Sequence, residues 1–325
     1  ARYRFSWKNP LVLSLGIFMG IIALANVLGN APYLSFWSSA ERMDGYVSLL
    51  HLAAYFVALV GLLRTRVNME RMMLFLLGLG VVLAVVGWGQ EKGRVDSVLG
   101  NPIYLASLSF FGIFISGYFM TAKKTFLGIP RVAQVIFFGL LSLVFLYTVF
   151  RTGTRGALLG LVGGGFTSAL LISVLVKDPA NKLWRWFAFA VVIFTLIAGG
   201  LFFGAREQLS EIQFVKDDVL LSRLMRISPE DRTTGFRLAN WDMAIEGWKE
   251  RPILGWGQEG YTEVFSKHYD VQSLYNAEQW YDRVHNTFLD WLVFGGILGL
   301  LAYVGIFLSV VYMLWVRSTF SIVEK

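Results

Sequence analysis

The chain has 325 residues, of which 56% are hydrophobic and only 16% are charged. A soluble domain carries roughly a quarter of charged residues, so this composition favours a membrane protein with several spans over a soluble one. The net charge of +7 does not indicate nucleic acid, because most lysines and arginines lie in short loops between apolar segments. The chain has no cysteine, which excludes disulfides and thiolate metal sites.

Eight apolar stretches are long enough to cross the roughly 30 Å of hydrocarbon in a bilayer. They lie near 11–28, 46–63, 72–88, 103–121, 131–150, 157–176, 184–204 and 295–316. The predicted fold is therefore an all-α polytopic membrane protein with about eight transmembrane helices. Residues 1–204 hold the first seven spans, 205–285 form a large helical outer loop, and 286–325 form the last span with a cytoplasmic tail.

The connections between spans alternate in charge, which predicts their sides of the membrane. The basic connections carry Arg2, Arg4 and Lys8; Arg64, Arg66 and Arg71; Lys123, Lys124 and Arg131; Lys177, Lys182 and Arg185; and Arg317 and Lys325. The positive-inside rule then places both termini in the cytoplasm and loop 205–285 outside. Because the chain starts with alanine and shows no cleavable signal pattern, we expect it to be part of a longer one.

The outer loop contains two stretches with helical spacing of apolar residues. In 236–261, "FRLANWDMAIEGWKERPILGWGQEGY", the apolar positions are Phe236, Trp241, Ala244, Ile245 and Trp248. This spacing predicts an amphipathic helix that Pro252 and the following glycines end. A second amphipathic helix is predicted over 206–227, with Leu209, Ile212, Phe214, Val215, Leu220 and Leu224 available for burial.

The stretch "TGTRGALLGL" (152–161) begins the sixth span with an arginine in its first turn. Thr154 is a candidate N-cap, and a helix N-terminus that also carries Arg155 favours an anion. The planar guanidinium suits phosphate because it can bind two oxygens at once. The alternative is an interfacial arginine that reaches lipid phosphates. Since a cation in the first turn opposes the helix dipole, we expect Arg155 to have a partner.

The segment "GWGQEG" (255–260) has the letters of a dinucleotide-binding motif. That motif requires a strand before it and a helix after it in a parallel sheet, and an outer loop between spans offers neither. We therefore predict that these glycines form a turn. Local sequence alone gives Arg237, in the preceding helix, only the role of a solvated charge.

The three histidines are too scattered in sequence to predict a metal site. His51 lies inside the second predicted span, where we expect a neutral imidazole bonded to a neighbouring helix. His268 lies in a polar stretch and is expected to be solvated. His285 sits at the outer membrane boundary, followed by Asn286, where it can cap a helix, anchor a loop or move protons.

Taken in order, three segments resemble the O-antigen ligase and polymerase superfamily, which also contains bacterial protein O-oligosaccharyltransferases. They are "TGTRGALLGL", "FRLANWDMAIEGWKERPILGWGQEGY" and "HNTFLDWLVFGGILGL" (285–300). Segments 36–56 and 99–107 also look like outer-loop segments of these proteins, so the similarity runs from about residue 36 to 316. Members of the family often have more than eight spans.

This resemblance implies a GT-C-like helical bundle and a glycosyltransferase that uses neither a metal nor another cofactor. Its donor would be a glycan on undecaprenyl diphosphate, and its acceptor would be lipid A–core, another glycan or a protein hydroxyl. The site would face the periplasm from the bacterial inner membrane. Matching motif to motif, Arg155 and Arg237 would hold the diphosphate and His285 would act as base near the acceptor. Three further candidates lie in or beside these segments: Arg42, Arg151 and Asn286.

Other functions make different demands on the same sequence. Ligation is expected within the family, with glycan polymerisation and protein O-glycosylation as alternatives that need the same donor. A transporter or flippase would show paired broken helices or an internal repeat, and neither is visible in the sequence. A scaffold would leave Arg155, Arg237 and His285 far apart, whereas a transferase requires all three to border one cavity.

Overall fold

The computed structural model describes residues 6–40, 42–90, 93–122, 125–126, 128–175, 182–225, 232–269 and 280–317. Every regular element among them is a helix, so the predicted fold class, an all-α polytopic membrane protein, is confirmed. Seven helices in the described part are long and apolar enough to cross a membrane, and the second predicted span, near 46–63, forms a shorter apolar helix of 17 residues. Several residues used to predict topology lie outside the described ranges: Arg2, Arg4, Lys123, Lys124, Lys177 and Lys325.

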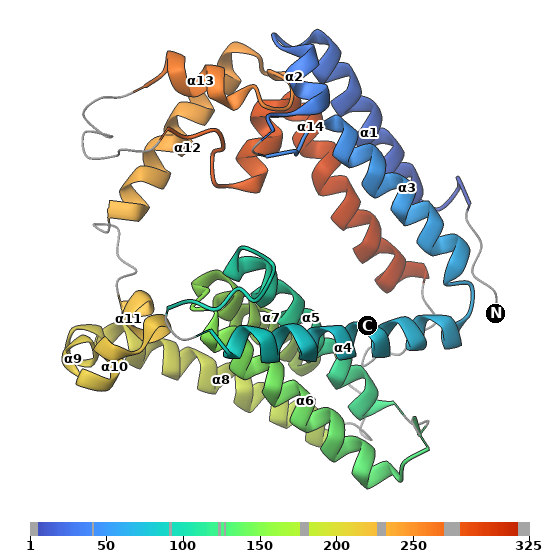
Figure 1. The fold of residues 1–325 in the computed structure, drawn as a ribbon, viewed down its shortest axis with the longest axis vertical. Helices are drawn as coiled ribbons and strands as arrows, with labels where there is room; N and C mark the ends of the chain where they lie inside the picture. The colour runs from blue at the N-terminus through green and yellow to red at the C-terminus, as the bar shows by residue number, and fades with distance from the viewer. Residues whose placement is uncertain are drawn as a thin grey trace. The chain divides into compact units, whose positions relative to one another are not determined.

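The chain divides into two compact units, coloured by residue number in Figure 1. The first comprises Ala1–Thr65 and Ser228–Phe320, and the second comprises Arg66–Ile227. The predicted outer loop 205–285 therefore contributes to both units, and its described part is largely helical. Its predicted boundaries with the membrane stay a prediction.

The first unit contains six α-helices in its described residues: α1 (Pro10–Leu28), α2 (Pro32–Trp37), α3 (Tyr46–Leu62), α12 (Arg232–Glu250), α13 (Tyr261–Lys267) and α14 (Thr287–Tyr312). A π-helical turn, Met313–Arg317, continues α14. Helix α1 packs along α14 and also contacts α3 (Figure 1). The spans that are first and last in this chain are thus neighbours in space.

The second unit contains eight helices in its described residues: α4 (Arg66–Trp88), α5 (Pro102–Thr121), α6 (Arg131–Arg151), α7 (Arg155–Leu175), α8 (Lys182–Gly204), α9 (Arg206–Glu211), α10 (Gln213–Asp217) and α11 (Val219–Met225). Helix α5 packs mainly against α6, and α7 packs against α8. An aromatic core lies among α4, α5 and α6, built from Leu77, Phe119, Phe126, Phe138 and Phe145.

Three of the long apolar helices begin at an asparagine that caps them. The side chains of Asn9, Asn101 and Asn286 each accept a hydrogen bond from the backbone N–H two residues later, at 2.9, 2.9 and 3.1 Å. In α1 and α5 a proline follows the asparagine, and proline at the first helical position loses no hydrogen bond there. These local sequences define where the helices start.

Helix α14 is interrupted at Gly296, whose backbone (φ 61°, ψ −161°) is non-helical. A break in a membrane helix leaves backbone groups without helical partners, which is tolerated only where other protein groups satisfy them. The turn at residues 252–257 supplies those partners through three short bonds: Trp256 N–H to Val293 O (2.8 Å), Gly257 N–H to Phe294 O (2.9 Å) and Ile297 N–H to Pro252 O (2.8 Å). Outer-loop backbone thus completes a broken span.

The glycines of "GWGQEG" form this turn, as predicted, and no strand precedes them. Gly255 and Gly257 have φ values of +65° and +85°, a region that disfavours side chains. A Cβ on Gly255 would lie 2.2 Å from the carbonyl oxygen of Val293. The glycines therefore allow both the turn and its close approach to α14.

The predicted helix after residue 236 is α12, and its apolar face differs from the predicted one. Phe236, Trp241 and Ala244 pack into the core as expected, but Ile245 is exposed. Met243 is buried in its place. Gly247 allows Val264 to approach closely, because a Cβ at residue 247 would lie only 2.3 Å from the Val264 side chain. The contact with α13 rotates the buried face relative to the one inferred from apolar residues alone.

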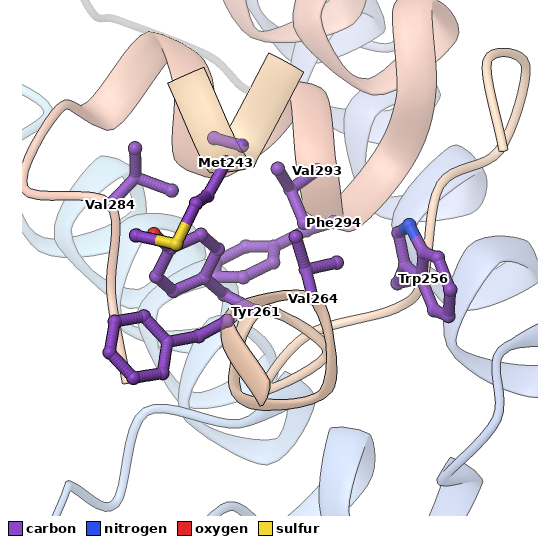
Figure 2. Packing of buried hydrophobic residues seen from close by; sticks show 9 residues of the cluster. Met243, Trp256, Tyr261, Val264, Val284, Val293 and Phe294 are labelled. Atoms are coloured by element: carbon purple, nitrogen blue, oxygen red, sulfur yellow. The ribbon is translucent and has the colours of Figure 1, made fainter. Parts of the chain in front are cut away.

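This core of the first unit joins α12, the glycine turn, α13 and the start of α14. Its buried members are Met243, Ala244, Trp256, Tyr261, Val264, Phe265, Val284, Val293 and Phe294. Figure 2 shows Met243 from α12, Tyr261 and Val264 from α13, and Phe294 from α14 close together. The core fixes α12 and α13 on the broken end of α14.

The prediction of a single helix over 206–227 is wrong for the described residues. Three short helices, α9 to α11, replace it, because Ile212 and Asp218 adopt extended backbone. The Asp218 carboxylate accepts a hydrogen bond from the N–H of Leu221 at 2.7 Å and so restarts the helix. Ile212 and Phe214, expected to be buried, are exposed. Residues 226–227 lie outside the described ranges.

The break in α14 leads to a first prediction, on stability. Gly296→Ala should destabilise the protein by at least about 2 kcal/mol, because only glycine adopts this backbone without strain and the new Cβ would overlap the backbone of the glycine turn. That Cβ would lie 2.2 Å from the carbonyl oxygen of Ile253. Gly305→Ala in the same helix meets nothing within 4 Å and serves as control. Thermal unfolding in detergent micelles measures both, and equal melting temperatures would contradict the proposed fit.

Candidate functional site

The short segment before α14 carries His285 in an uncommon backbone conformation. Its φ is +59°, which costs a residue other than glycine about 1–3 kcal/mol and persists only where the surrounding structure holds it. The imidazole is accessible to solvent, and its ring meets that of Tyr281 edge to face with centroids 5.5 Å apart. The segment around His285 must therefore be held in place by other residues.

The residues on either side of His285 are each fixed by a different part of the first unit. The guanidinium of Arg42 donates two hydrogen bonds to the Asp282 carboxylate, at 2.5 and 2.7 Å. The N–H of Val284 donates to the Asp290 carboxylate at 3.0 Å, and Asn286 caps α14. The main chain is therefore anchored both before and after His285.

Arg283 forms the most buried ion pair of this region. Its guanidinium donates to Glu259 at 2.6 Å, and the two side chains are 11% and 4% exposed. Asp44 lies 3.5 Å away on the same guanidinium nitrogen. The pKa of Arg283 is raised: burial opposes the charged form, but the hydrogen bond to Glu259 and the nearby carboxylates outweigh it.

Sequence reasoning missed Gln258 and Glu259, which follow the glycine turn. Gln258 exchanges two hydrogen bonds with the Asn26 side chain of α1, at 3.0 and 2.8 Å, and donates a third to the carbonyl of Asp44 at 3.1 Å. Glu259 accepts from the hydroxyl of Ser38 at 2.7 Å. Only their polarity directly after buried glycines signalled a role, and polar residues are equally common in solvated turns.

The electrostatic surroundings of His285 are dominated by two arginines and one carboxylate. Partial burial lowers the pKa of His285, and the positive charge of Arg237 lowers it further; Asp282 raises it, and Arg42 lowers it. The imidazole is therefore neutral at neutral pH, the form that accepts a proton. Two other predicted site residues, Arg42 and Arg237, thus lie close enough to His285 in the first unit to affect its pKa, and Asn286 follows it in the chain.

Arg237 lies on α12 with an exposed side chain. Local sequence alone made it a solvated charge, but it lies close enough to His285 for its positive charge to lower the pKa of the imidazole.

Arg155 and Arg151 belong to the second unit, on either side of the tight turn between α6 and α7. Arg155 is the first residue of α7, and Arg151, the last of α6, donates to the hydroxyl of Tyr147 at 3.1 Å. The carbonyl of Thr154 accepts from the N–H of Leu158 at 3.3 Å, as the residue before a helix should. That either arginine binds the substrate diphosphate stays a prediction.

A further arginine, Arg94, joins this turn and was missed by sequence reasoning. It donates to the carbonyl of Thr152 at 2.9 Å and to the hydroxyl of Thr154 at 3.2 Å. Burial lowers the pKa of Arg94, and the neighbouring charge of Arg155 lowers it further. The bonds of Arg94 to Thr152 and Thr154 thus bring its charge close to that of Arg155, through a contact with the turn before α7 that no local pattern reveals.

The other two histidines differ from expectation. His51 bonds through Nδ1 to the carbonyl of Val47 in its own helix, at 2.7 Å, rather than to a neighbouring one. His268 is paired with Glu250 at 2.9 Å instead of being only solvated, because α13 ends beside the end of α12. Among the described residues no group of three or more histidines and carboxylates is placed to hold a metal ion.

The charges around His285 lead to a second prediction, on its titration. Arg237→Gln should raise the pKa of His285, since it removes a positive charge, and Asp282→Asn should lower it, since it removes a negative one. NMR of ¹⁵N-histidine-labelled protein in nanodiscs measures these shifts, with His285→Asn to assign the signal. Unchanged pKa values in both variants, or a wild-type value above that of a free histidine, would contradict this geometry.

Comparison with known proteins agrees with the resemblance seen in the sequence. Residues 140–304, slightly more than half of the chain, match the family described as O-antigen ligase. A Haemophilus influenzae (strain Rd) protein described as uncharacterized is 24% identical over 233 residues, which cover 69% of this chain and 53% of that protein. The chain thus spans about half the length of this relative, and no solved structure matches it. The chain belongs to the O-antigen ligase family.

Proposed function

We propose that the protein transfers a glycan from undecaprenyl diphosphate to an acceptor hydroxyl at the periplasmic face of the bacterial inner membrane. Its family suggests a glycosyl-transferring enzyme, and its apolar helices suit a lipid-borne donor. The observation that carries the proposal is that His285, at the head of α14, lies close enough to the exposed Arg237 for the positive charge of Arg237 to lower the pKa of the imidazole.

His285 is the base of the proposed reaction. It takes the proton from the acceptor hydroxyl while the hydroxyl oxygen bonds to the anomeric carbon of the donor sugar. The bond from that carbon to the diphosphate oxygen breaks, and undecaprenyl diphosphate leaves with the electron pair. The proton then passes from the imidazolium to solvent. A lowered pKa keeps the imidazole unprotonated between turnovers.

Arg237 stabilises the leaving group in this proposal. Negative charge grows on the diphosphate as the glycosidic bond breaks, and a guanidinium placed beforehand stabilises it without reorganising. Arg42 is less suited to this role, because its guanidinium is already bonded in both directions to Asp282. By its family motif, Arg155 is proposed as a second ligand of the diphosphate, and Arg94 donates to Thr152 and Thr154 in the turn just before it.

Ligase-type transfer to lipid A–core is the acceptor assignment that we propose, with polymerisation and protein O-glycosylation as the alternatives. Deleting the gene and separating surface polysaccharides on a gel distinguishes them. We expect the whole polysaccharide ladder to be lost while lipid-linked glycan accumulates. A single-repeat band would instead indicate a polymerase, and an intact ladder with unglycosylated protein would indicate a protein transferase.

His285→Asn tests the base most sharply. Asparagine tolerates positive φ better than most residues and caps helices well, but it cannot take a proton at neutral pH. The variant should insert, keep its melting temperature and bind the lipid-linked donor, yet lose about 10²–10⁴-fold in turnover. The measurement is transfer rate together with donor binding in nanodiscs.

His268→Asn is the matched control, because it removes a histidine of the same unit that is paired with Glu250. It should turn over like the wild type. An active His285→Asn enzyme would remove the base from the mechanism and leave His285 with a role in positioning only.

Lysine replacements test the two proposed diphosphate ligands. Arg237→Lys and Arg155→Lys should each reduce turnover by about ten-fold or more, because a lysine keeps the charge but lacks the fork that binds two oxygens. Wild-type turnover in either single variant would exclude that residue as a ligand, and Lys249→Arg on the exposed side of α12 is the control.

A further inference from the structure

We propose that the buried Glu259–Arg283 ion pair is a positioning element that sets the location of the His285 imidazole. This inference rests on the proposed function, since it concerns the placement of the proposed base. Neither residue touches the reacting groups in this account. They act by holding the main chain two residues before His285 in one place relative to α14.

The Glu259 end of the pair is anchored independently of Arg283. Its main chain continues the turn whose N–H groups at residues 256 and 257 bond to the break in α14. Its neighbour Gln258 is held by Asn26 of α1. The hydroxyl of Ser38 donates a hydrogen bond to the Glu259 carboxylate at 2.7 Å and so orients it. Glu259 is therefore a fixed point defined by two spans.

Arg283 links Glu259 to the segment that carries His285. Its guanidinium donates to Glu259 at 2.6 Å, and it lies over the ring of Phe294 with 5.1 Å to the centroid. Phe294 belongs to the same stretch of α14 that the glycine turn completes. The Glu259 carboxylate and the Phe294 ring thus hold the Arg283 side chain in one position, which also restricts the backbone of residue 283.

His285 comes two residues later, at the only residue of 282–286 with positive φ. Val284 between them is fully buried and bonded through its N–H to Asp290. A strained residue keeps its conformation only if the residues around it cannot relax. Arg283 and Val284 supply that constraint before His285, and the Asn286 cap supplies it afterwards.

A role in stability alone explains this ion pair poorly. The cost of removing two charges from water largely cancels their attraction, so replacing a whole buried pair with apolar residues is often neutral for folding. Hydrogen-bonded charges are, however, strongly directional. The two roles therefore predict different results when both partners are replaced together.

The test is the double variant Glu259→Met/Arg283→Met, which removes both charges with unbranched side chains of similar length. Purified protein in nanodiscs is assayed with a synthetic undecaprenyl-diphosphate-linked oligosaccharide. We expect a melting temperature close to that of the wild type and a donor KM within about two-fold, while kcat falls about ten-fold or more. Glu246→Met/Lys249→Met, which removes an exposed pair on α12, is the control and should leave kcat unchanged.

Wild-type kcat in the double variant would overturn the positioning role, and so would a fall in kcat that is matched by loss of donor affinity and of stability. If the double variant fails to insert, Glu259→Gln carries the same test, because it keeps the side-chain volume and the acceptor oxygen but weakens the bond to Arg283. Its kcat should fall with donor KM unchanged, and wild-type kcat would overturn the proposal.

Failure of this inference is distinguishable from failure of the proposed function. An inactive His285→Asn enzyme beside a fully active double variant would overturn only the positioning role. An active His285→Asn enzyme would overturn the base assignment itself.

Discussion

The first unit depends on the backbone hydrogen bonds between the glycine turn and the break in α14. A span interrupted at Gly296 has carbonyl and amide groups that must find partners in a medium without water. The turn at 252–257 supplies these partners. Only glycine at positions 255 and 296 allows the turn and α14 to approach so closely. Once this contact forms, Gln258 and Glu259 are delivered to α1 and to Arg283. In our proposal, Arg283 then determines the position of the candidate base, His285.

The same charges serve two demands of the proposed chemistry. A diphosphate leaving group needs positive charge nearby, and a histidine base needs to be neutral before it acts. Arg237 meets both, because a cation close to an imidazole also lowers its pKa. Arg42 also lowers the pKa of His285, but the Asp282 carboxylate to which it is bonded raises that pKa and so opposes its effect. An unpaired second arginine at that position would lower the pKa of the base further and weaken it.

The sequence was sufficient for features that local patterns encode. Apolar length located the spans, and the glycines after Pro252 were correctly identified as a turn. Motif order singled out His285 and Arg237, which the structure brings together. It also singled out Arg155, whose role depends on groups beyond its own helix.

The rest depends on contacts between residues far apart in the chain. Arg42 and Asp282 are separated by 240 positions, and Asn26 and Gln258 by 232, so no local period links them. The break in α14 was hidden in a continuous apolar run, because adjacent glycines are common inside spans. The helix expected over 206–227 was divided by Asp218, whose side chain competes for backbone amides in a way that apolar spacing does not register.

The most direct measurement of the central claim is the stoichiometry of transfer by the purified protein in nanodiscs. The substrates are a fluorescent glycan on undecaprenyl diphosphate and lipid A–core as acceptor, with a chelator present. The account predicts one undecaprenyl diphosphate released for each glycan joined to the acceptor, with the rate unaffected by the chelator. Donor that remains intact, or that only changes leaflet in sealed vesicles, would contradict it.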